Sequence, residues 1–449
     1  MDLPGRVLIV GASVRAQVES ALRAGFAVDA LDLFADRDTR LMIQRSAIAS
    51  SADNSVASSL SQIRGFTDVL AFVDQCNQCD GVIVCGGIEN QIELVEALEK
   101  RIKLIGSGSG VLSRIRNSVE LQQTMSRSLS ADGINLPSTV RRLQSELNSE
   151  QHSGSRAWLA KKDGSSGGFG IALADSRAVG DLVGDCDRYF QERVTGECIS
   201  VLYLSRGDGQ SIPSSTSYSA TTIVGVTQQL VGDKNVGANE FQYCGSIGPY
   251  TPEEIGQAIG VGLETPAGHL DQIQRIGDFL AQQYGLVGVW GIDFIVNDAG
   301  VWPVDVNARL TASAELYESK IAASSDFKSI VGLHVAACIE ADDESAWSEW
   351  GKLGRGYQGL VEGKLVLFNR NESPIQITSD LSDDLMAQFE IGFFGSDQIG
   401  ATLADVPCAG DSTQSGHPIL TIRVRCSSAD EVRAEMQGLA KCIYRMVER

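Results

Sequence analysis

The sequence lacks a surplus of basic residues. Its 449 residues include 37 lysines and arginines against 57 aspartates and glutamates, which gives a formal net charge of −20. Nucleic-acid backbones and anionic membranes attract basic surfaces, so neither is expected as the principal partner. A small anionic ligand remains compatible with this charge, because it needs only a local basic pocket.

The sequence also lacks an apolar run long enough to span a bilayer. Residues 1–4 lead directly into a strand pattern, without the features of a signal peptide. The ten cysteines are scattered, and the lone CxxC of Cys76 and Cys79 is half a zinc motif, for which ordinary packing is the simpler interpretation. We therefore expect a cytoplasmic protein with reduced thiols.

Two common nucleotide-binding fingerprints are missing as well. The first strand pattern ends at Gly11 without GxGxxG, so a dinucleotide site is not expected, and GxxxxGK[ST] occurs nowhere. The turn after Gly11 precedes a helix pattern that carries Arg15. This turn either docks an anionic group at the helix N-terminus or only packs the helix on the sheet.

Strand–glycine–helix units recur in the first quarter of the chain. Strand patterns cover 6–10, 28–33, 81–85 and 103–105, and helix patterns cover 14–24, 67–75 and 91–101. This alternation predicts a parallel, doubly wound sheet with ligands at the carboxyl ends of its strands. The serine-rich stretch 46–61 is expected to be a weakly ordered connection, and residues 111–129 a single helix.

A lysine-bearing strand and a glycine-rich loop occupy residues 158–171. The strand carries Lys161, and the sequence DGSSGGFG follows before a second strand resumes at Ile171. Glycines let a backbone close over phosphates, and a lysine adds a point charge. Many glycine-rich hairpins are only mobile loops, so this segment gains its weight from the acidic hairpin downstream.

The most informative stretch is 288–309, GVWGIDFIVNDAGVWPVDVNAR. Two β-rich runs flank a turn at 297–300, which predicts a hairpin. Asp293 lies on the first strand, while Asp305 and Asn307 share one face of the second, with Arg309 following. Two carboxylates and an amide oxygen suit Mg²⁺, and the arginine suits a phosphate. The alternative is a hairpin whose acidic face is merely solvated.

These segments resemble the ATP-grasp superfamily, most specifically over residues 158–309. The lysine strand with SSGGFG, the QERVTGE strand and GIDF…VDVNAR carry the resemblance, and the GASVRA unit resembles the lobe that precedes that fold. The whole-chain pattern is most similar to a branch associated with tetrahydromethanopterin and methanofuran biosynthesis. The resemblance implies ATP bound with Mg²⁺ (or Mn²⁺) between two α+β subdomains.

The resemblance also assigns roles to individual residues. It implies phosphate contact by Lys161 and a phosphate-covering loop of Ser166, Gly167, Gly168 and Gly170. It implies an adenine-reading hinge of Glu192, Arg193 and Val194, with Glu197 at the ribose. It implies metal ligation by Asp293, Asp305 and Asn307, with Lys161 and Arg309 acting in catalysis.

The chain departs from the usual family pattern at several positions. Asp305 stands where glutamate is usual, and Lys162 and Ala308 stand where proline is usual. Arg114, Arg116 and Asn117 lie where a second, earlier phosphate-contacting lysine would be sought. The departures at Asp305 and Ala308 leave room for a nucleotide-binding protein that no longer turns over.

These observations together predict three regions. They are a parallel α/β domain (1–112), an ATP-grasp domain (113–345, with a mobile lid at about 140–195) and a small β-rich α+β lobe (346–449). The expected activity is ADP-forming ligation of a small-molecule carboxylate to an amine, with an amino-acid-like acceptor, through an acyl phosphate; a thiol acceptor is the other one considered. A kinase- or carboxylase-like relative and a regulatory protein without turnover are the alternatives, and a homodimer is left open.

Overall fold

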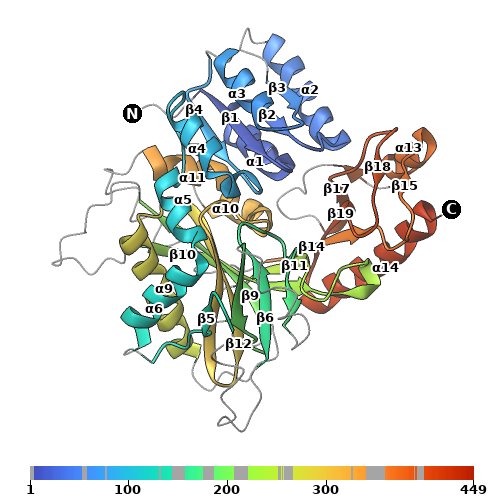
Figure 1. Cartoon of the computed structure of the whole chain (residues 1–449). Helices are drawn as coiled ribbons and strands as arrows, with labels where there is room; N and C mark the ends of the chain where they lie inside the picture. The colour runs from blue at the N-terminus through green and yellow to red at the C-terminus, as the bar shows by residue number, and fades with distance from the viewer. Residues whose placement is uncertain are drawn as a thin grey trace.

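The structure is a computed structural model in which an N-terminal lobe lies above a central body and a C-terminal lobe lies beside both (Figure 1). The described residues are 5–52, 58–75, 78–130, 133–143, 157–174, 187–206, 221–250, 254, 256, 266–324, 327–339, 359–388, 390–391 and 399–448. Within these residues, no helix is both long enough and apolar enough to cross a membrane.

The N-terminal lobe is built on a parallel sheet with the strand order β3-β2-β1-β4. The strands are β1 (Arg6–Gly11), β2 (Ala27–Asp32), β3 (Ser59–Gln62) and β4 (Gly81–Val84). The helices are α1 (Arg15–Ala24), α2 (Arg37–Ala52), α3 (Phe66–Gln75), η1 (Ile88–Asn90) and α4 (Ile92–Glu99). The β1 run is buried throughout, as expected for a parallel strand covered on both faces. The predicted parallel sheet is confirmed.

Two local predictions in this region need correction. The serine-rich stretch 46–61 is largely regular, because α2 extends to Ala52 and β3 pairs with β2, where the Ser59 hydroxyl donates to Asp29. Residues 53–57 lie outside the described part. The single helix predicted at 111–129 is two helices, α5 (Ser109–Arg116) and α6 (Ser118–Leu129). Asn117 separates them with a non-helical ψ of 74°.

A nine-stranded sheet runs through the central body and the C-terminal lobe, in the order β13-β12-β9-β10-β11-β14-β19-β17-β16. Its central strands are β9 (Glu197–Ser205), β10 (Thr221–Val231), β11 (Tyr243–Tyr250), β12 (Gly288–Asn297) and β13 (Gly300–Asn307). Its C-terminal strands are β14 (Val361–Phe368), β16 (Glu390–Ile391), β17 (Gly400–Ala404) and β19 (Pro418–Cys426). The C-terminal lobe therefore extends the central sheet.

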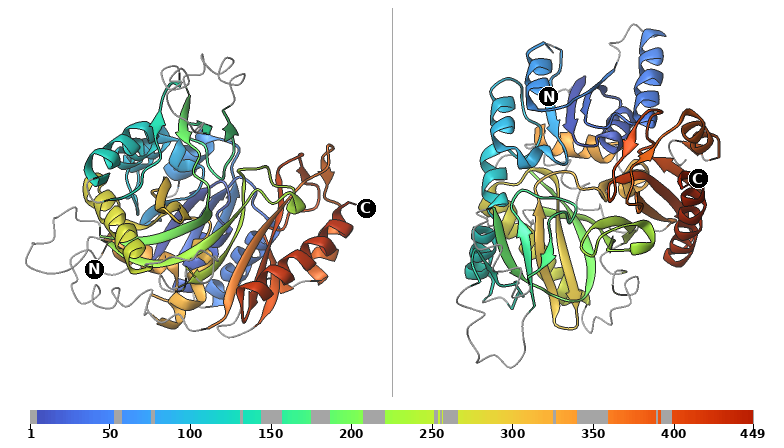
Figure 2. Two further views of the ribbon diagram at one scale, coloured as in Figure 1. Left: turned by 90° about the horizontal axis from the view of Figure 1, so that it is seen from below. Right: turned by 45° about the vertical axis from the view of Figure 1, so that its right-hand side comes forward.

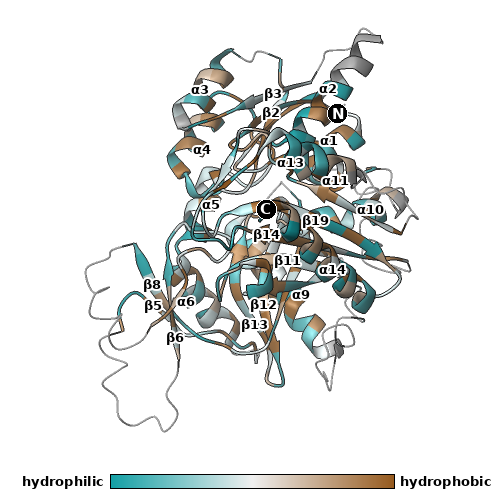
Figure 3. Ribbon diagram, turned by 90° about the vertical axis from the view of Figure 1, so that its right-hand side faces the viewer, coloured by the Kyte–Doolittle hydropathy of each residue, from teal (hydrophilic) through white to brown (hydrophobic). Residues whose placement is uncertain are grey.

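A second, smaller antiparallel sheet has the order β5-β8-β6-β7 and projects from the body (Figure 3). Its strands are β5 (Thr139–Val140), β6 (Trp158–Lys162), β7 (Ala172–Leu173) and β8 (Arg188–Glu192). It has its own small core of Leu143, Trp158, Ala160 and Phe190. A sheet with a core of its own can move as a unit against the rest, as the predicted lid requires.

The remaining elements cover or connect these sheets. They are η3 (Lys234–Val236), α9 (Pro266–Tyr284), η4 (Ala314–Tyr317), α10 (Glu318–Ser324), α11 (Ile330–Ile339), β15 (Ile375–Gln376), α13 (Ser379–Gln388), β18 (Ser412–Thr413) and α14 (Ala429–Val447). Helix α11 is apolar all round because it packs between α1 and β12. Helix α14 is amphipathic and lies along β14 and β19 (Figure 2).

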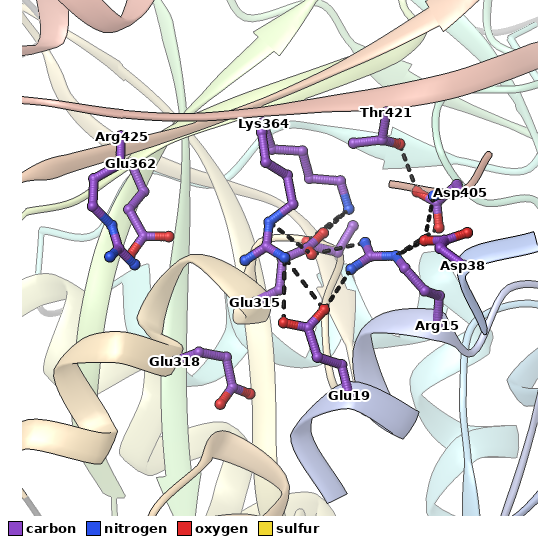
Figure 4. Close-up of polar contacts among 12 residues, drawn as sticks. Arg15, Glu19, Asp38, Glu315, Glu318, Glu362, Lys364, Asp405, Thr421 and Arg425 are labelled. Carbon is purple, nitrogen blue, oxygen red and sulfur yellow. Dashed lines mark hydrogen bonds and ion pairs between the residues drawn. The ribbon is translucent and has the colours of Figure 1, made fainter. Parts of the chain in front are cut away.

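A buried network of charged side chains joins the three lobes (Figure 4). Arg15 on α1 donates to Glu315 on η4 at 2.7 Å and to Asp405, just after β17, at 2.9 Å. Glu315 also pairs with Lys364 on β14 and Arg423 on β19. Each of these ion pairs crosses from one lobe to another.

This network decides between the two interpretations of the Gly11 turn. Arg15 is 2% exposed and its guanidinium is engaged by carboxylates of this chain. The backbone N–H of Val14, which precedes α1, donates to the Asp32 carboxylate at 2.8 Å. The turn therefore packs the helix on the sheet, which was the second of the two interpretations, because the chain supplies its own anions there.

Candidate active site

The predicted acidic hairpin is formed by β12 and β13. Asp293 is the direct cross-strand partner of Asp305, and Gly291 that of Asn307. Facing residues of an antiparallel pair put their side chains on the same face, so the two aspartates and the asparagine share one surface of the sheet. The side-chain amide of Asn307 donates to Asp293 at 3.2 Å, which confirms that these groups meet.

Burial and a neighbouring like charge together raise the pKa of Asp293 on this surface. Burial raises the pKa of Asp293 to about 7, with Asp305 adding to the effect, while hydrogen bonds from Ser200 and Asn307 and the charge of Arg309 oppose it. The amide of Gln229 on β10 also donates to Asp293, at 2.9 Å. A pair of carboxylates held against charge repulsion, with an amide oxygen beside it, is a donor set that fits a hard divalent cation.

Arg309 follows the hairpin and is held by the N-terminal lobe. Its Nε donates to the Glu89 carboxylate at 2.6 Å, and Arg116 donates to the same oxygen at 2.9 Å. One terminal nitrogen of Arg309 donates to the Leu310 carbonyl at 3.0 Å, and the other lies 3.5 Å from Oδ1 of Asn307. The guanidinium therefore lies beside the predicted metal ligands.

Lys161 reaches the same place from the lid. It is 8% exposed, and its Nζ donates to Gln191 at 2.6 Å and to the Val304 carbonyl on β13 at 3.5 Å. Burial lowers the pKa of Lys161, and the carboxylates of Asp305 and Asp293 oppose that shift. Lys162, the next residue, is exposed. The predicted strand register is thus confirmed, with Lys161 facing the hairpin.

The glycine-rich loop lies against the start of β11. The Gly167 carbonyl accepts the backbone N–H of Tyr243 at 3.1 Å. Gly168 has a φ of +80°, and a Cβ there would lie 1.9 Å from the Phe241 carbonyl oxygen. Gly170 also has a positive φ, and the Ser166 carbonyl accepts from Phe169 at 3.3 Å within a turn. Only glycine permits this close approach of two backbones.

The predicted hinge connects the lid to the central sheet. Glu192 exchanges backbone and side-chain bonds with Ser138, and the Arg193 N–H donates to the Ala157 carbonyl. The Arg193 guanidinium pairs with Glu240 at 3.4 Å and lies over the ring of Phe241. Val194 is half-buried after them. The hinge thereby meets the segment that receives the glycine loop.

In the described part of the chain, the side chain of Glu197 makes no hydrogen bond or ion pair with the other predicted site residues. It is exposed at the start of β9 and accepts a 3.3 Å hydrogen bond from Gln228, in the sheet. The structure therefore brings together Lys161, Asp293, Asn307 and Arg309, with Asp305 in register, while the glycine loop and hinge meet near Phe241.

Sequence reasoning missed three side chains of this site. Glu89 follows the glycines at the carboxyl end of β4, the edge where parallel sheets bind ligands, and that position was the signal for it. Gln191 lies within the QERV motif, one residue before the hinge, on the side of β8 that faces Lys161. Gln229 has no recognisable signal, because it reaches Asp293 only through the pairing of β10 with β9 and of β9 with β12.

The fold and this arrangement are those of an ATP-grasp domain. Residues 122–313 match the family model described as an ATP-grasp domain, so the chain carries such a domain. Among curated proteins, none matches the sequence significantly. The similarity to the tetrahydromethanopterin and methanofuran branch is not addressed by these comparisons and stays a prediction.

Solved structures with the same fold cover nearly all of the chain. An N5-carboxyaminoimidazole ribonucleotide synthetase in complex with ADP aligns with a TM-score of 0.61 at 15% identity, over 100% of this chain and 99% of that one. The enzyme of the same name from Thermus thermophilus aligns with 0.60 at 14%, over 99% of both chains. The biotin carboxylase domain of the Hydrogenobacter thermophilus 2-oxoglutarate carboxylase aligns with 0.62 at 12%, over 97% and 89%. At such identities the likeness establishes the fold.

Proposed function

We propose that this protein is an ATP- and Mg²⁺-dependent ligase that activates a small-molecule carboxylate as an acyl phosphate and joins it to an amine. The meeting of Lys161 from the lid with the Asp293–Asp305–Asn307 surface is the observation that carries this proposal. The solved structures support it, since one holds ADP and another MgADP with bicarbonate. The reactions that their names describe belong to those proteins, and the reaction of this chain is part of the proposal.

The chain's residues divide the expected work. Asp293, Asp305 and Asn307 would hold the metal ion, which neutralises phosphate charge when bound. Lys161 and Arg309 stabilise negative charge on the transferred phosphoryl group, and the glycine loop excludes water from it. Substrate positioning and charge stabilisation suffice for this chemistry, because the phosphoryl group passes directly to the substrate carboxylate and no enzyme-bound intermediate is needed.

Atoms and charge balance over two steps. The substrate carboxylate attacks the γ-phosphorus of ATP, which gives an acyl phosphate and ADP. The neutral amine then attacks the acyl carbon, the C–O bond to phosphate breaks, and the proton lost by nitrogen goes to the leaving phosphate, which gives an amide and hydrogen phosphate. A cytoplasmic enzyme acting on small molecules, as a monomer or a homodimer, is consistent with this proposal.

A carboxylase-like reaction is the second candidate, favoured by the names of the structural neighbours. Bicarbonate would then be the acid that is phosphorylated. ADP release with bicarbonate alone, compared with a panel of organic acids and amines, separates the two candidates. A nucleotide-binding protein without turnover would release ADP with none of them.

Thermal unfolding with nucleotides tests the nucleotide site before any substrate is known. ADP or ATP with Mg²⁺ should raise the melting temperature, because a ligand that binds only the folded state stabilises it. NAD and GTP should do much less. Equal shifts with NAD and ATP would contradict the assignment of an adenine-nucleotide site.

A further inference from the structure

The carboxylate of Glu89 occupies an unusual position between two arginines from different parts of the chain. It is 1% exposed, and Arg116 and Arg309 both donate to its Oε1. Its Oε2 is buried and has no hydrogen-bond partner among the described residues. A carboxylate that only satisfied two arginines would gain more by engaging each with its own oxygen, so the shared oxygen indicates a geometric demand on the arginines.

The cluster of Glu89, Arg116 and Arg309 carries a net positive charge beside the hairpin. Arg116 and Arg309 hold the pKa of Glu89 low although its burial acts in the opposite direction, so Glu89 is ionised near neutral pH. One anion between two cations leaves the cluster with a net positive charge. Arg309 carries part of that charge toward the hairpin, because Oδ1 of Asn307 accepts from one of its terminal nitrogens at 3.5 Å.

Gly86 of the N-terminal lobe lies near the Arg309 guanidinium, with room for one further carbon between them. A Cβ added to Gly86 would lie 3.8 Å from Cζ of Arg309, an ordinary van der Waals distance. The guanidinium is therefore fixed by Glu89 at Nε and by the Leu310 carbonyl at one terminal nitrogen. Its other terminal nitrogen is directed to the metal surface.

We infer that Glu89 is a positioning residue that presents Arg309 to the metal-bound phosphate, so that the β4–η1 loop of the N-terminal lobe is part of the active centre. This inference rests on the proposed function and assigns a role to a residue outside the 122–313 family match. Phosphate contact would be made by Arg309, and Glu89 would act only through it.

Melting temperatures with a phosphate mimic test this role without a known substrate. The wild type, Glu89→Gln and Glu96→Gln are measured alone, with MgADP, and with MgADP plus beryllium fluoride. Glu96 is the matched control, because it is an exposed carboxylate of the same lobe paired with Lys100 at 2.7 Å. A purely structural Glu89 would change the melting temperature of the free protein and leave both ligand responses unchanged.

The expected result is a selective loss. Glu89→Gln keeps the shift with MgADP and loses most of the additional shift with beryllium fluoride, whose apparent affinity falls roughly 10- to 100-fold. Glu96→Gln behaves as the wild type. Glu89→Asp keeps the charge and moves the acceptor oxygen, so it should fold even if Glu89→Gln does not, and should also lose part of the fluoride response.

Three outcomes would overturn the inference, and they differ from one another. An undiminished fluoride response in Glu89→Gln, or in Glu89→Asp if the former does not fold, makes the cluster an ordinary ion pair. A wild type that responds to MgADP but not to beryllium fluoride leaves no phosphate contact for Glu89 to position. A wild type that does not respond to MgADP defeats the proposed function itself.

Discussion

At the scale of single residues, Asp293 and Asp305 are expected to lower the stability of the folded protein when no cation is bound. Burial raises the pKa of Asp293 to about 7, and repulsion by Asp305, its direct cross-strand partner, adds to this shift. Such groups destabilise the folded state without a bound cation and bind it strongly when it is supplied. The two effects can be measured separately.

Asp305→Asn should therefore change stability and cation response in opposite directions. The free protein should gain on the order of 1 kcal/mol, because a like charge beside Asp293 is removed. The additional stabilisation that Mg²⁺ confers with ADP should largely disappear, since Mg²⁺ relies on one or two carboxylates. Melting temperature against Mg²⁺ concentration in the presence of ADP measures both.

Asp298, exposed in the turn of the same hairpin, is the control for this experiment. Asp298→Asn should leave the Mg²⁺ response unchanged. Asp305→Glu restores the side chain that the family usually has and should keep more of the response than Asp305→Asn. If Asp305→Asn and Asp298→Asn behave alike, the metal surface does not include Asp305.

The two adjacent lysines give a second comparison of single residues. Lys161→Met keeps the buried apolar stem and removes the charge, so ATP binding should weaken by about 1.5–3 kcal/mol. Lys162→Met should have little effect, because Lys162 is exposed on the other face of β6. Calorimetric titration with MgATP measures both, and greater sensitivity at Lys162 would show that Lys161 is not the phosphate contact.

At the scale of elements, the glycine loop depends on its close contact with the segment before β11. Gly168→Ala places a Cβ where the Phe241 carbonyl oxygen lies, so the loop must move away from β11. We expect the protection of residues 164–170 from hydrogen exchange on binding MgADP to be lost, with little change in global stability. The measurement is hydrogen exchange with and without MgADP.

Gly164→Ala is the control for the loop. Gly164 also has a positive φ, but its added Cβ would meet only the Asn90 side chain, at 3.8 Å. In both variants an alanine must adopt a positive φ, which costs on the order of 1 kcal/mol. Only the variant at Gly168 also clashes with the Phe241 carbonyl oxygen. Equal effects of both would show that the contact with Phe241 is unimportant.

The elements also show what the sequence could and could not predict. The hairpin at 288–309 and the strand of Lys161 were predictable, because alternation and turn residues are local signals. The break at Asn117 and strand β3 were not, since pairing and packing decided them against weak local preference. Glu89 was missed because Arg309, its partner, lies 220 positions later.

At the scale of the whole molecule, the lobes are held together by buried charge whose ionisation depends on pH. Burial raises the pKa of Glu318 to about 7, and Glu19 adds to this, while Arg23 and hydrogen bonds from Ser20 and the Ile330 N–H oppose it. The unfolded chain releases this proton near its ordinary pKa. Glu318 therefore contributes stability at low pH, which is lost as pH rises from about 4.5 to about 7.

Glu318→Gln should remove that dependence. The variant should be more stable than the wild type at pH 8, by on the order of 1–3 kcal/mol, and the difference should vanish near pH 4. Urea unfolding at a series of pH values measures it, with the exposed Glu93→Gln as the control. A difference independent of pH would show that Glu318 does not titrate in this range.

The nine-stranded sheet has a consequence for the synthesis of this chain on the ribosome. Strand β11 pairs with β14, in which Leu365 faces Gly245. The edge of β11 therefore stays unpaired until the ribosome has synthesised β14. During that interval, a nascent chain that already contains the whole ATP-grasp match displays an open strand edge, which is a template for pairing with other chains. A truncated chain that ends before Val361 keeps this edge permanently, so its expression should yield aggregates. The C-terminal lobe then protects the nascent sheet within the same chain.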